Sequence, residues 1–491
     1  MRFQTIILPV LSSLAVMLSV FFCLPVLGMV CMVPLLFSLQ SIPLKVYLQQ
    51  VLIFSSVYSL FLFFWMLSSS TQFTGNIGYG ILGMVVSVVL FTSLYTGVFL
   101  IWRKFCKAVL NWQNIALLGC LFVLMEAVDD YVFKTHPWYS NQHFGSPLIG
   151  SVYTLQLAEI GGVYVLTFLM LIINGGIAYG LKEKRQFKVV AIIVVIFFCT
   201  NILIFNLRTE PKSPENEIKI NLLNANLSPL TDWESKGNEI VLKIIALSKQ
   251  NEISSAADFN IWTESVVPWA YQVDDDFINA VLANASGSQI INLIGMNTEY
   301  TQNVVFNSAY AIAAGNTMLG RYDKVYPLAL MERPFKNNAT IQVANNGAYV
   351  KPGVTYKPIP TEKGAVGVYI CNEATIAKAV AMLVINGADF LVNISNDGWF
   401  KDTHIPLRHF YYNRLRAVEN RRDVAINSNY GYSGKAAANG DVFMIKQSDS
   451  PTFNQITLYK ATAKTIYSHY PNGFTLIIIL LTITLILIKK S

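Results

Sequence analysis

The most constraining feature of the chain is an uncharged run near its start. Residues 3–44 contain no Asp, Glu, Lys or Arg. A bilayer core needs about 20 mostly apolar residues per helix, so this run has about the length of two spans. It predicts two transmembrane helices, at 4–22 and 25–41. A cleaved signal peptide would have a shorter apolar core, so we favour two spans over that alternative.

Six further apolar segments each match the length of a membrane span. They lie at 46–66, 78–101, 112–131, 161–180, 189–206 and 474–488. Only 13% of the residues are charged, whereas soluble domains contain about 25%. The sequence therefore predicts an α-helical membrane domain with eight transmembrane helices, and it excludes a wholly soluble or disordered chain.

The stretch between the seventh and eighth expected spans has a different composition. Residues 208–471 alternate short apolar runs with amphipathic segments and contain 24 basic and 24 acidic residues. The net charge of +7 therefore belongs to the membrane part, which argues against nucleic acid as a partner. We predict three domains: a transmembrane domain of seven helices at 1–207, a water-soluble α/β domain at 208–471, and a C-terminal transmembrane helix at 472–491.

Basic residues indicate how the spans are oriented, because cytoplasmic loops retain Lys and Arg. With the N-terminus inside, eleven of the twelve basic residues of the membrane part fall on the cytoplasmic side, and Lys134 is the exception. The soluble domain then lies on the outer side. Glu126, Asp129, Asp130 and Glu159 fall near the outer ends of the fifth and sixth spans. We expect these acids either to end the helices at headgroup level or to serve a functional site.

Within the soluble domain, alternating strand and helix patterns predict an α/β layer structure. The expected strands are 218–224, 258–262, 290–295, 304–313, 365–370, 389–394 and 424–427. The expected helices are 237–249, 275–285, 374–385 and 406–420. A domain of this length can bury a full hydrophobic core.

The soluble domain contains a single cysteine, Cys371. The commonest role of a free cysteine is that of a small buried hydrophobe. Cys371, however, follows the strand expected at 365–370 and precedes the helix expected at 374–385. Backbone N–H groups and the helix dipole at such a position favour a thiolate and can stabilise an oxyanion. The position therefore also suggests a nucleophile.

A nucleophilic cysteine usually needs a base. The three histidines of the domain, His404, His409 and His469, belong to no recognisable motif. Glu264, which follows the strand expected at 258–262, is an alternative base, and Lys324 is a candidate electrostatic partner. Either charge alone would suggest only a solvated surface residue. No His/Cys cluster has the spacing of zinc ligands, so we expect neither a metal nor another cofactor.

Five short motifs together point to a known family. They are Trp-x-Glu at 262–264, Tyr-x-Lys at 322–324, Cys-Asn-Glu at 371–373, Asn-Asp-Gly-Trp-Phe at 396–400 and Pro-Trp at 137–138. With these motifs the chain resembles, over essentially its whole length, the apolipoprotein N-acyltransferases, a membrane-embedded branch of the nitrilase (carbon–nitrogen hydrolase) superfamily. The resemblance implies a nitrilase-like αββα sandwich and a catalytic triad of Glu264, Lys324 and Cys371. It implies substrate-binding or supporting roles for Trp233, Glu332, Asn372 and Glu373.

The resemblance also implies a reaction and a location. A phospholipid acyl donor would form a thioester on Cys371, and the N-terminal amine of a diacylglyceryl-cysteine lipoprotein would then take the acyl chain. The protein would be a multi-pass protein of the bacterial inner membrane, with its catalytic domain on the periplasmic side. Asn372 stands where the family commonly has tyrosine, and residues 327–332 depart from the family's Val-Pro-Phe-Gly-Glu run. These differences concern the walls of the substrate pocket.

Two other functions are compatible with the same residues. A membrane-bound carbon–nitrogen hydrolase or amidase would use the same triad and let water attack the thioester, but such an enzyme would not require eight spans. A non-catalytic membrane receptor or transporter would tolerate replacement of Cys371 and would carry charges deep within several helices. The acids of this chain lie near the expected helix ends instead, which disfavours transport.

Overall fold

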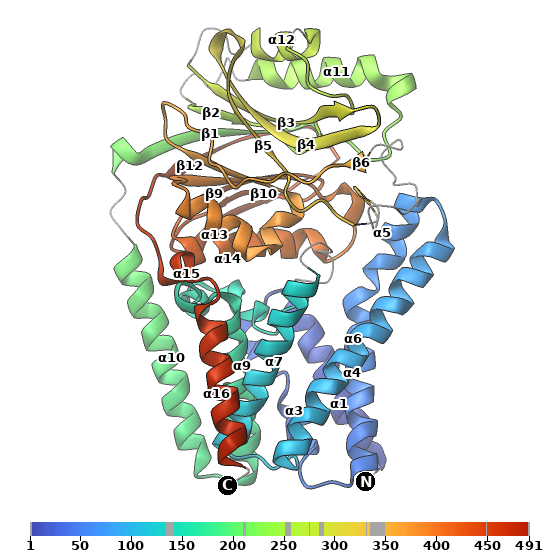
Figure 1. Cartoon of the computed structure of the whole chain (residues 1–491), viewed down its shortest axis with the longest axis vertical. Helices are drawn as coiled ribbons and strands as arrows, with labels where there is room; N and C mark the ends of the chain where they lie inside the picture. Colours follow the sequence, from blue (N-terminus) through green and yellow to red (C-terminus); the bar gives the residue numbers. More distant parts are fainter. Residues whose placement is uncertain are drawn as a thin grey trace. The chain divides into compact units, whose positions relative to one another are not determined.

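The chain forms two compact units. The structure, a computed structural model, describes residues 2–133, 142–209, 213–250, 257–273, 275–283, 289–329, 331–333, 349–447 and 449–489. The helical unit comprises Met1–Val132, Tyr139–Thr209 and Tyr470–Ser491, and the sheet unit comprises Phe133–Trp138 and Glu210–His469. Figure 1 shows the helices of the first unit and the strands of the second.

The helical unit contains four helical stretches that are long and apolar enough to cross a membrane, counted over the described residues. They are Leu44–Thr74, Ile77–Cys106, Ala158–Lys182 and Gln186–Arg208. Shorter apolar helices cover Thr5–Phe21, Pro25–Ser38 and Gly473–Ile488. Helix length and composition thus support four candidate spans, and the arrangement with eight spans stays a prediction.

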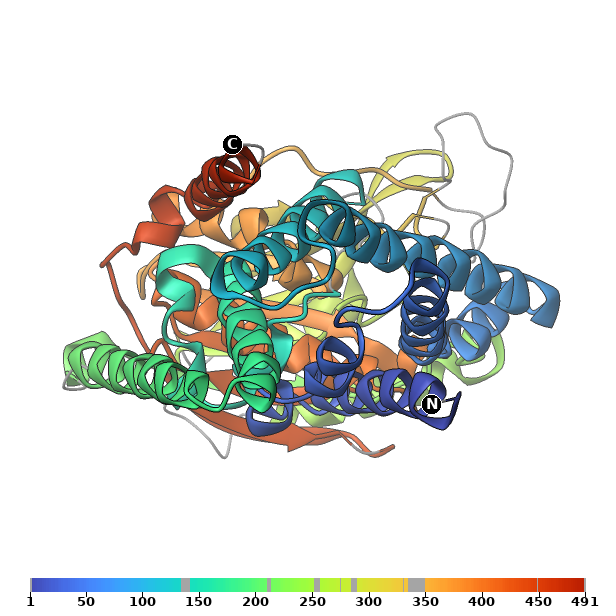
Figure 2. The same ribbon diagram turned by 90° about the horizontal axis from the view of Figure 1, so that it is seen from below.

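The helical unit contains helices of very different lengths. Their bounds are α1 (Arg2–Phe21), α2 (Pro25–Gly28), α3 (Val33–Ser38), α4 (Leu44–Phe63), α5 (Trp65–Thr74), α6 (Ile77–Cys106), α7 (Trp112–Val132), α8 (Val152–Leu155), α9 (Ala158–Lys182), α10 (Gln186–Arg208) and α16 (Gly473–Ile488). The start of α1 and the end of α16 lie at the same end of the unit (Figure 1). Helix α10 lies at the periphery (Figure 2), and few of its residues are buried.

The segment expected as one span at 25–41 is not an unbroken helix. It forms α2 and α3, and the chain turns between them. Asn174 of α9 makes this break possible: its Oδ1 accepts from Met32 N at 2.8 Å, and its Nδ2 donates to Gly28 O at 2.8 Å. A buried backbone that leaves helical geometry needs such partners for its freed N–H and C=O groups.

The acidic residues near the ends of α7 and α9 bind neighbouring segments of the helical unit. Glu126 is buried and accepts from Phe144 N at 2.7 Å and from Thr167 Oγ1 at 2.8 Å. Tyr164 OH donates to Asp130 at 2.5 Å. Glu126 thus links α7 to the segment at Phe144 and to α9. Lys134 and the Pro137-Trp138 motif lie outside the described residues.

The sheet unit is built from two sheets. One has the strand order β12-β1-β2-β3-β4-β5, with β6 paired to β4, and the other has the order β11-β10-β9-β8-β7. Strands β1, β2 and β3 are mutually parallel, as are β7, β8 and β9. The strands are β1 (Glu217–Asn224), β2 (Phe259–Ile261), β3 (Ile291–Thr301), β4 (Val304–Ala313), β5 (Thr317–Asp323), β6 (Tyr349–Val350), β7 (Val366–Ile370), β8 (Phe390–Asn396), β9 (Val424–Asn429), β10 (Tyr432–Ala436), β11 (Val442–Lys446) and β12 (Thr452–Tyr459).

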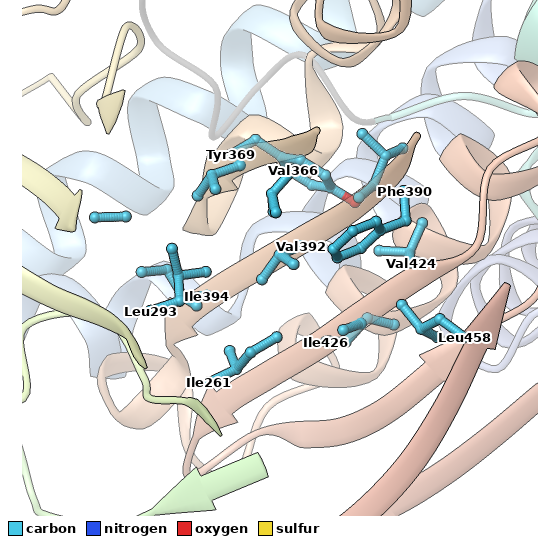
Figure 3. Packing of buried hydrophobic residues seen from close by; sticks show 14 of the residues in the cluster. Ile261, Leu293, Val366, Tyr369, Phe390, Val392, Ile394, Val424, Ile426 and Leu458 are labelled. Atoms are coloured by element: carbon cyan, nitrogen blue, oxygen red, sulfur yellow. The ribbon is translucent and has the colours of Figure 1, made fainter. Parts of the chain in front are cut away.

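The two sheets pack face to face, with helices on both outer faces. Side chains from both sheets fill the layer between them, and Ile261 and Leu293 of one sheet join Val392 and Ile426 of the other (Figure 3). Helices α11 (Trp233–Lys249) and α12 (Asp276–Ala283) cover the first sheet. Helices α13 (Ala377–Ile385) and α14 (Ile405–Asn420) cover the second, with α15 (Ile466–His469) beside them. The unit is therefore an αββα sandwich.

The expected elements correspond to β1–β4, β7–β9 and α11–α14, whereas five strands were not expected. Strands β5 and β12 form the edges of the first sheet, and β11 forms one edge of the second. Strand β10 lies between β11 and β9, and β6 is a short strand paired to β4. Antiparallel edge strands are solvated on one face and lack a continuous apolar run. Strand β12, for example, mixes polar with apolar residues, and its pairing partner β1 lies far away in the sequence.

Candidate active site

Cys371 occupies a tight turn at the end of a buried strand. Strand β7 ends at Ile370, and the 3₁₀ helix η5 (Cys371–Thr375) begins at once. The backbone of Cys371 has a φ of 54°, which is uncommon for a residue with a side chain. Asn393 of β8 supports this turn, since its Nδ2 donates to Tyr369 O at 3.1 Å and to Cys371 O at 3.3 Å. The residue is only 4% exposed.

Glu264 and Lys324 form a buried ion pair. Glu264 follows β2, and Lys324 follows β5 of the same sheet. Lys324 Nζ lies 3.1 Å from Glu264 Oε1 and 2.9 Å from Glu332 Oε1. Asn307 of β4 joins the same two oxygens, because its Nδ2 donates to Glu264 at 2.7 Å and to Glu332 at 3.0 Å. One ammonium and one amide thus hold two carboxylates together.

The second carboxylate oxygen of Glu264 is held from the other sheet. Asn396, the last residue of β8, donates its backbone N–H to Glu264 Oε2 at 2.9 Å. Glu264 therefore receives hydrogen bonds from a strand end of each sheet. The carboxyl ends of the parallel strands β2, β7 and β8 bring Glu264, Cys371 and Asn396 to one edge of the sandwich. Such edges are where ligands bind in α/β sheets.

Charges and burial determine the protonation of these groups. Burial opposes the charged ammonium, but Glu264 and Glu332 outweigh it and raise the pKa of Lys324. Burial raises the pKa of Glu264, with Lys324 opposing and Glu332 reinforcing this effect. Burial also raises the pKa of the Cys371 thiol well above its ordinary value, and the Glu264 charge raises it further. Lys324 acts in the opposite direction on the thiol.

Burial of Cys371 thus acts against the thiolate that a position before a helix N-terminus favours. Helix α13 begins only at Ala377, so its dipole does not act directly at the sulfur. Desolvation is the largest influence on the pKa of the Cys371 thiol, and it favours the neutral form. Formation of a thiolate then requires a base, and Glu264 is the carboxyl group whose charge acts most strongly on the thiol.

Glu373 holds the nucleophile turn against the segment that carries Lys324. Its Oε1 accepts from the backbone N–H groups of Val325 at 2.7 Å and Tyr326 at 3.1 Å. Its Oε2 accepts from Ile370 N at 2.7 Å and from Tyr322 OH at 3.0 Å. Burial is the main reason that the pKa of Glu373 rises to about 7. Glu373 is thus placed to position Cys371 relative to Lys324.

The remaining expected site residues differ in their placement. Asn372 is buried directly after Cys371, and its Nδ2 donates to Tyr326 O at 3.1 Å. Trp233 begins α11 on the outer face of the first sheet, where its ring contacts Trp269 edge to face at a centroid distance of 5.9 Å. In the described part of the chain, no hydrogen bond joins Trp233 to Glu264, Lys324 or Cys371.

Other residues at the site were given no role from the sequence. Asp397, which acts electrostatically on Cys371, pairs with His409 Nδ1 at 2.7 Å and accepts from Ser428 Oγ at 2.8 Å. Asn307 and Asn393 are similar cases. In the sequence, each of these two asparagines is a polar residue within an apolar strand. That pattern indicates a functional site only when the hydrogen-bond partners of the side chain are known. No group of three or more His, Cys, Asp or Glu residues within the described ranges could hold a metal ion.

Comparison with known proteins places these residues in a family. Residues 237–448 match the family model for carbon–nitrogen hydrolases, and residues 11–176 match that for the N-terminal domain of apolipoprotein N-acyltransferases. The chain belongs to the apolipoprotein N-acyltransferase family. It is therefore an enzyme with a carbon–nitrogen hydrolase domain.

Relatives and a solved structure show how far the likeness extends. The apolipoprotein N-acyltransferase of Geobacter metallireducens is 25% identical over 390 residues, which is 74% of this chain and 71% of the relative. The apolipoprotein N-acyltransferase of Haemophilus ducreyi is 26% identical over 426 residues, which is 82% of this chain and 79% of the relative. A carbon–nitrogen hydrolase from Helicobacter pylori shares 15% identity and a TM-score of 0.37, covering 49% of this chain and 89% of that one.

Proposed function

We propose that the protein transfers a fatty acyl chain from a membrane phospholipid, through a thioester on Cys371, to the N-terminal amine of diacylglyceryl-cysteine lipoproteins. Its relatives are named apolipoprotein N-acyltransferases, and both family models fit this reaction. The observation that carries the proposal is the buried Glu264–Lys324 pair, 3.1 Å apart, acting on the thiol at the end of β7.

In the first half-reaction, the enzyme would be acylated. Glu264 takes the proton of the Cys371 thiol, and the sulfur attacks an ester carbonyl of the phospholipid. Lys324 and backbone N–H groups beside Cys371 stabilise the oxyanion, and one such donor typically contributes about 3–4 kcal/mol. The C–O bond breaks, Glu264 returns the proton to the leaving alkoxide, and a lysophospholipid departs.

In the second half-reaction, the acyl chain would move to the acceptor. The lipoprotein α-amine attacks the thioester carbonyl, Glu264 takes a proton from the amine, and the C–S bond breaks. The proton returns to the sulfur, so Cys371 is again a thiol. The exchange is an acyl transfer without oxidation or reduction, and it needs a lipid donor and an amine but no nucleotide.

The proposed location is the bacterial inner membrane, with several spans and the sheet unit on the periplasmic side. Four helical stretches have the length and apolarity of spans. The basic residues gather in those loops of the membrane part that an inside N-terminus makes cytoplasmic. A periplasmic site would meet lipoproteins after they cross the membrane.

Acylation of the purified enzyme tests the nucleophile. Incubated with radiolabelled phospholipid in detergent, the wild-type protein is expected to form an acyl adduct that hydroxylamine releases, because hydroxylamine cleaves thioesters. Cys371→Ala removes the sulfur and should abolish the adduct. Glu264→Gln should also prevent it, because the amide cannot take the thiol proton.

Matched variants give the controls. Cys199→Ala removes an exposed thiol of α10, and Glu239→Gln neutralises an exposed carboxylate of α11. Both proteins should form the adduct at the wild-type rate. An adduct that survives in Cys371→Ala would refute the assignment of the nucleophile, and normal acylation of Glu264→Gln would refute that of the base.

A further inference from the structure

A buried amide oxygen beside the nucleophile has no partner. Asn372 is 4% exposed, and its Nδ2 donates to the carbonyl oxygen of Tyr326 at 3.1 Å. A carbonyl only accepts hydrogen bonds, so this contact fixes which atom of the amide is Oδ1. Within the described residues, Asn372 Oδ1 has no hydrogen-bond partner. A buried unpaired carbonyl oxygen is costly and uncommon in native proteins, so it calls for an explanation.

The two half-reactions differ in what they can offer to this oxygen. The ester group of a phospholipid contains only acceptor oxygens, so the reacting centre of the acyl donor cannot pair with Asn372 Oδ1. An attacking amine, by contrast, carries N–H groups. Glu264 and Glu332 lie in the same site and favour a group with positive or partly positive hydrogens. The unpaired acceptor therefore matches the second substrate.

We infer that Asn372 Oδ1 belongs to the binding site for the primary amine of the acyl acceptor. This inference rests on the proposed acyl transfer. One N–H of the amine donates to Asn372 Oδ1, while the proton lost during attack goes to Glu264. The new C–N bond forms, the C–S bond to Cys371 breaks, and the proton returns to the sulfur. Asn372 thus orients the nitrogen lone pair toward the thioester carbonyl.

The hydroxyl group of the leaving lysophospholipid also has a hydrogen that it could donate to Asn372 Oδ1. The two sources act in different half-reactions. A role toward the leaving hydroxyl would affect formation of the thioester, whereas a role toward the amine affects its consumption. Separate measurement of the two half-reactions therefore distinguishes them.

The test uses full-length enzyme in detergent and measures both half-reactions. The acyl-enzyme is first formed with labelled phospholipid, and a synthetic diacylglyceryl-cysteine peptide is then added. Asn372→Leu keeps a similar volume but removes the acceptor. We expect its aminolysis rate to fall at least about tenfold more than its acylation rate, as for loss of a hydrogen bond to a buried group. Asn386→Leu is the matched control, since Asn386 is exposed and also donates to a tyrosine carbonyl, that of Tyr356.

A second acceptor separates recognition of the amine from general damage. An N-methylated peptide has one N–H fewer, so the wild-type enzyme should prefer the primary amine. That preference should shrink at least about fivefold in Asn372→Leu, because the second N–H no longer has a partner. Asn372→Asp, which keeps an acceptor oxygen but loses the bond to Tyr326, should retain the preference.

Several results would overturn the inference. These are an equal loss in both half-reactions, an unchanged preference in Asn372→Leu, or loss of the preference in Asn372→Asp. Failure of both variants to acylate would assign Asn372 to the first step or to folding, and would also overturn it. If the wild-type protein itself forms no thioester, the proposed function fails, and this outcome is distinct from the others.

Discussion

Lys324 is a buried ammonium that stands between two carboxylates. Removing such charges from water is costly, so a buried ion pair by itself says little about stability. The ion pair has a more specific effect on the protonation of Lys324 and Glu264. With Glu264 and Glu332 both within 3.1 Å of Nζ, Lys324 stays charged, and burial favours a proton on Glu264 more than in water. Burial also raises the pKa of the Cys371 thiol, so both partners of the proposed proton transfer bind their proton more tightly than in water.

The pH dependence of acylation follows from this arrangement. Glu264 acts as a base only when it is ionised, and its pKa is raised by burial. Acylation should therefore rise with pH, with a midpoint above the ordinary carboxyl range of about 4.3, and activity should be lost as pH falls through that midpoint. Lys324→Met removes the charge that opposes this shift, so the midpoint should move to higher pH while the maximal rate falls. Initial rates of thioester formation between pH 4 and pH 9 measure both effects.

Lys243→Met, at an exposed lysine of α11, provides the control for this experiment. Its pH profile should match that of the wild-type protein. A midpoint for Lys324→Met that stays at the wild-type value would show that Lys324 does not set the proton affinity of Glu264.

At the scale of elements, strand ends build the site. The parallel strands β7 and β8 end side by side, so the turn at Cys371 and the turn at Asn396 are neighbours. Asn393 links them by bonding the carbonyl oxygens on either side of Ile370. Its own Oδ1 accepts from Asn413 of α14 at 3.1 Å. A helix of the outer layer therefore helps to fix the backbone of Cys371.

Loss of the Asn393 amide should disturb this turn. Asn393→Leu leaves the carbonyls of Tyr369 and Cys371 without their side-chain donor. Each lost hydrogen bond contributes about 0.5–1.5 kcal/mol, so the rate of acylation should fall by about 5- to 100-fold. Asn439→Leu, in the partly exposed turn between β10 and β11, should have no such effect. Thioester formation and thermal denaturation would be measured together, and a lower Tm with an unchanged acylation rate would contradict the positioning role.

At the scale of the whole molecule, one chain forms two units of different composition. The helical unit carries the excess of basic residues, and the sheet unit is neutral in its charge balance. The helical unit is also interrupted where polar side chains supply partners for the backbone, as Asn174 does between α2 and α3. Such interruptions are tolerated at membrane depth only when they are buried in protein.

The orientation of the chain is testable with single cysteines. In a cysteine-free background, Ser228→Cys lies in an exposed loop of the sheet unit, and Lys184→Cys lies in the exposed turn between α9 and α10. A membrane-impermeant maleimide should label position 228 in intact spheroplasts. Position 184 should react only after the membrane is permeabilised, because basic loops stay in the cytoplasm. The reverse pattern would contradict the periplasmic location of the sheet unit.

Local patterns predicted the parallel strands well, because strands covered on both faces read as short apolar runs. The ranges expected at 218–224 and 365–370 correspond to β1 and β7 within a residue. The edge strand β12 was not expected, since it pairs with β1, which lies far away in the sequence. The unbroken helix at 25–41 was wrong for a similar reason: the break depends on Asn174, which is remote in sequence.

The sequence by itself determined that the chain has apolar helices and one α/β unit, because hydrophobic length and periodicity are local properties. It also placed Glu264 and Cys371 at strand ends. Only the tertiary structure decided which groups meet: the Lys324 contacts with two carboxylates, the clamp of Glu373 and the unpaired oxygen of Asn372. It also decided the direction in which the pKa of Cys371 moves, because desolvation depends on everything packed around the sulfur and not on its neighbours in sequence.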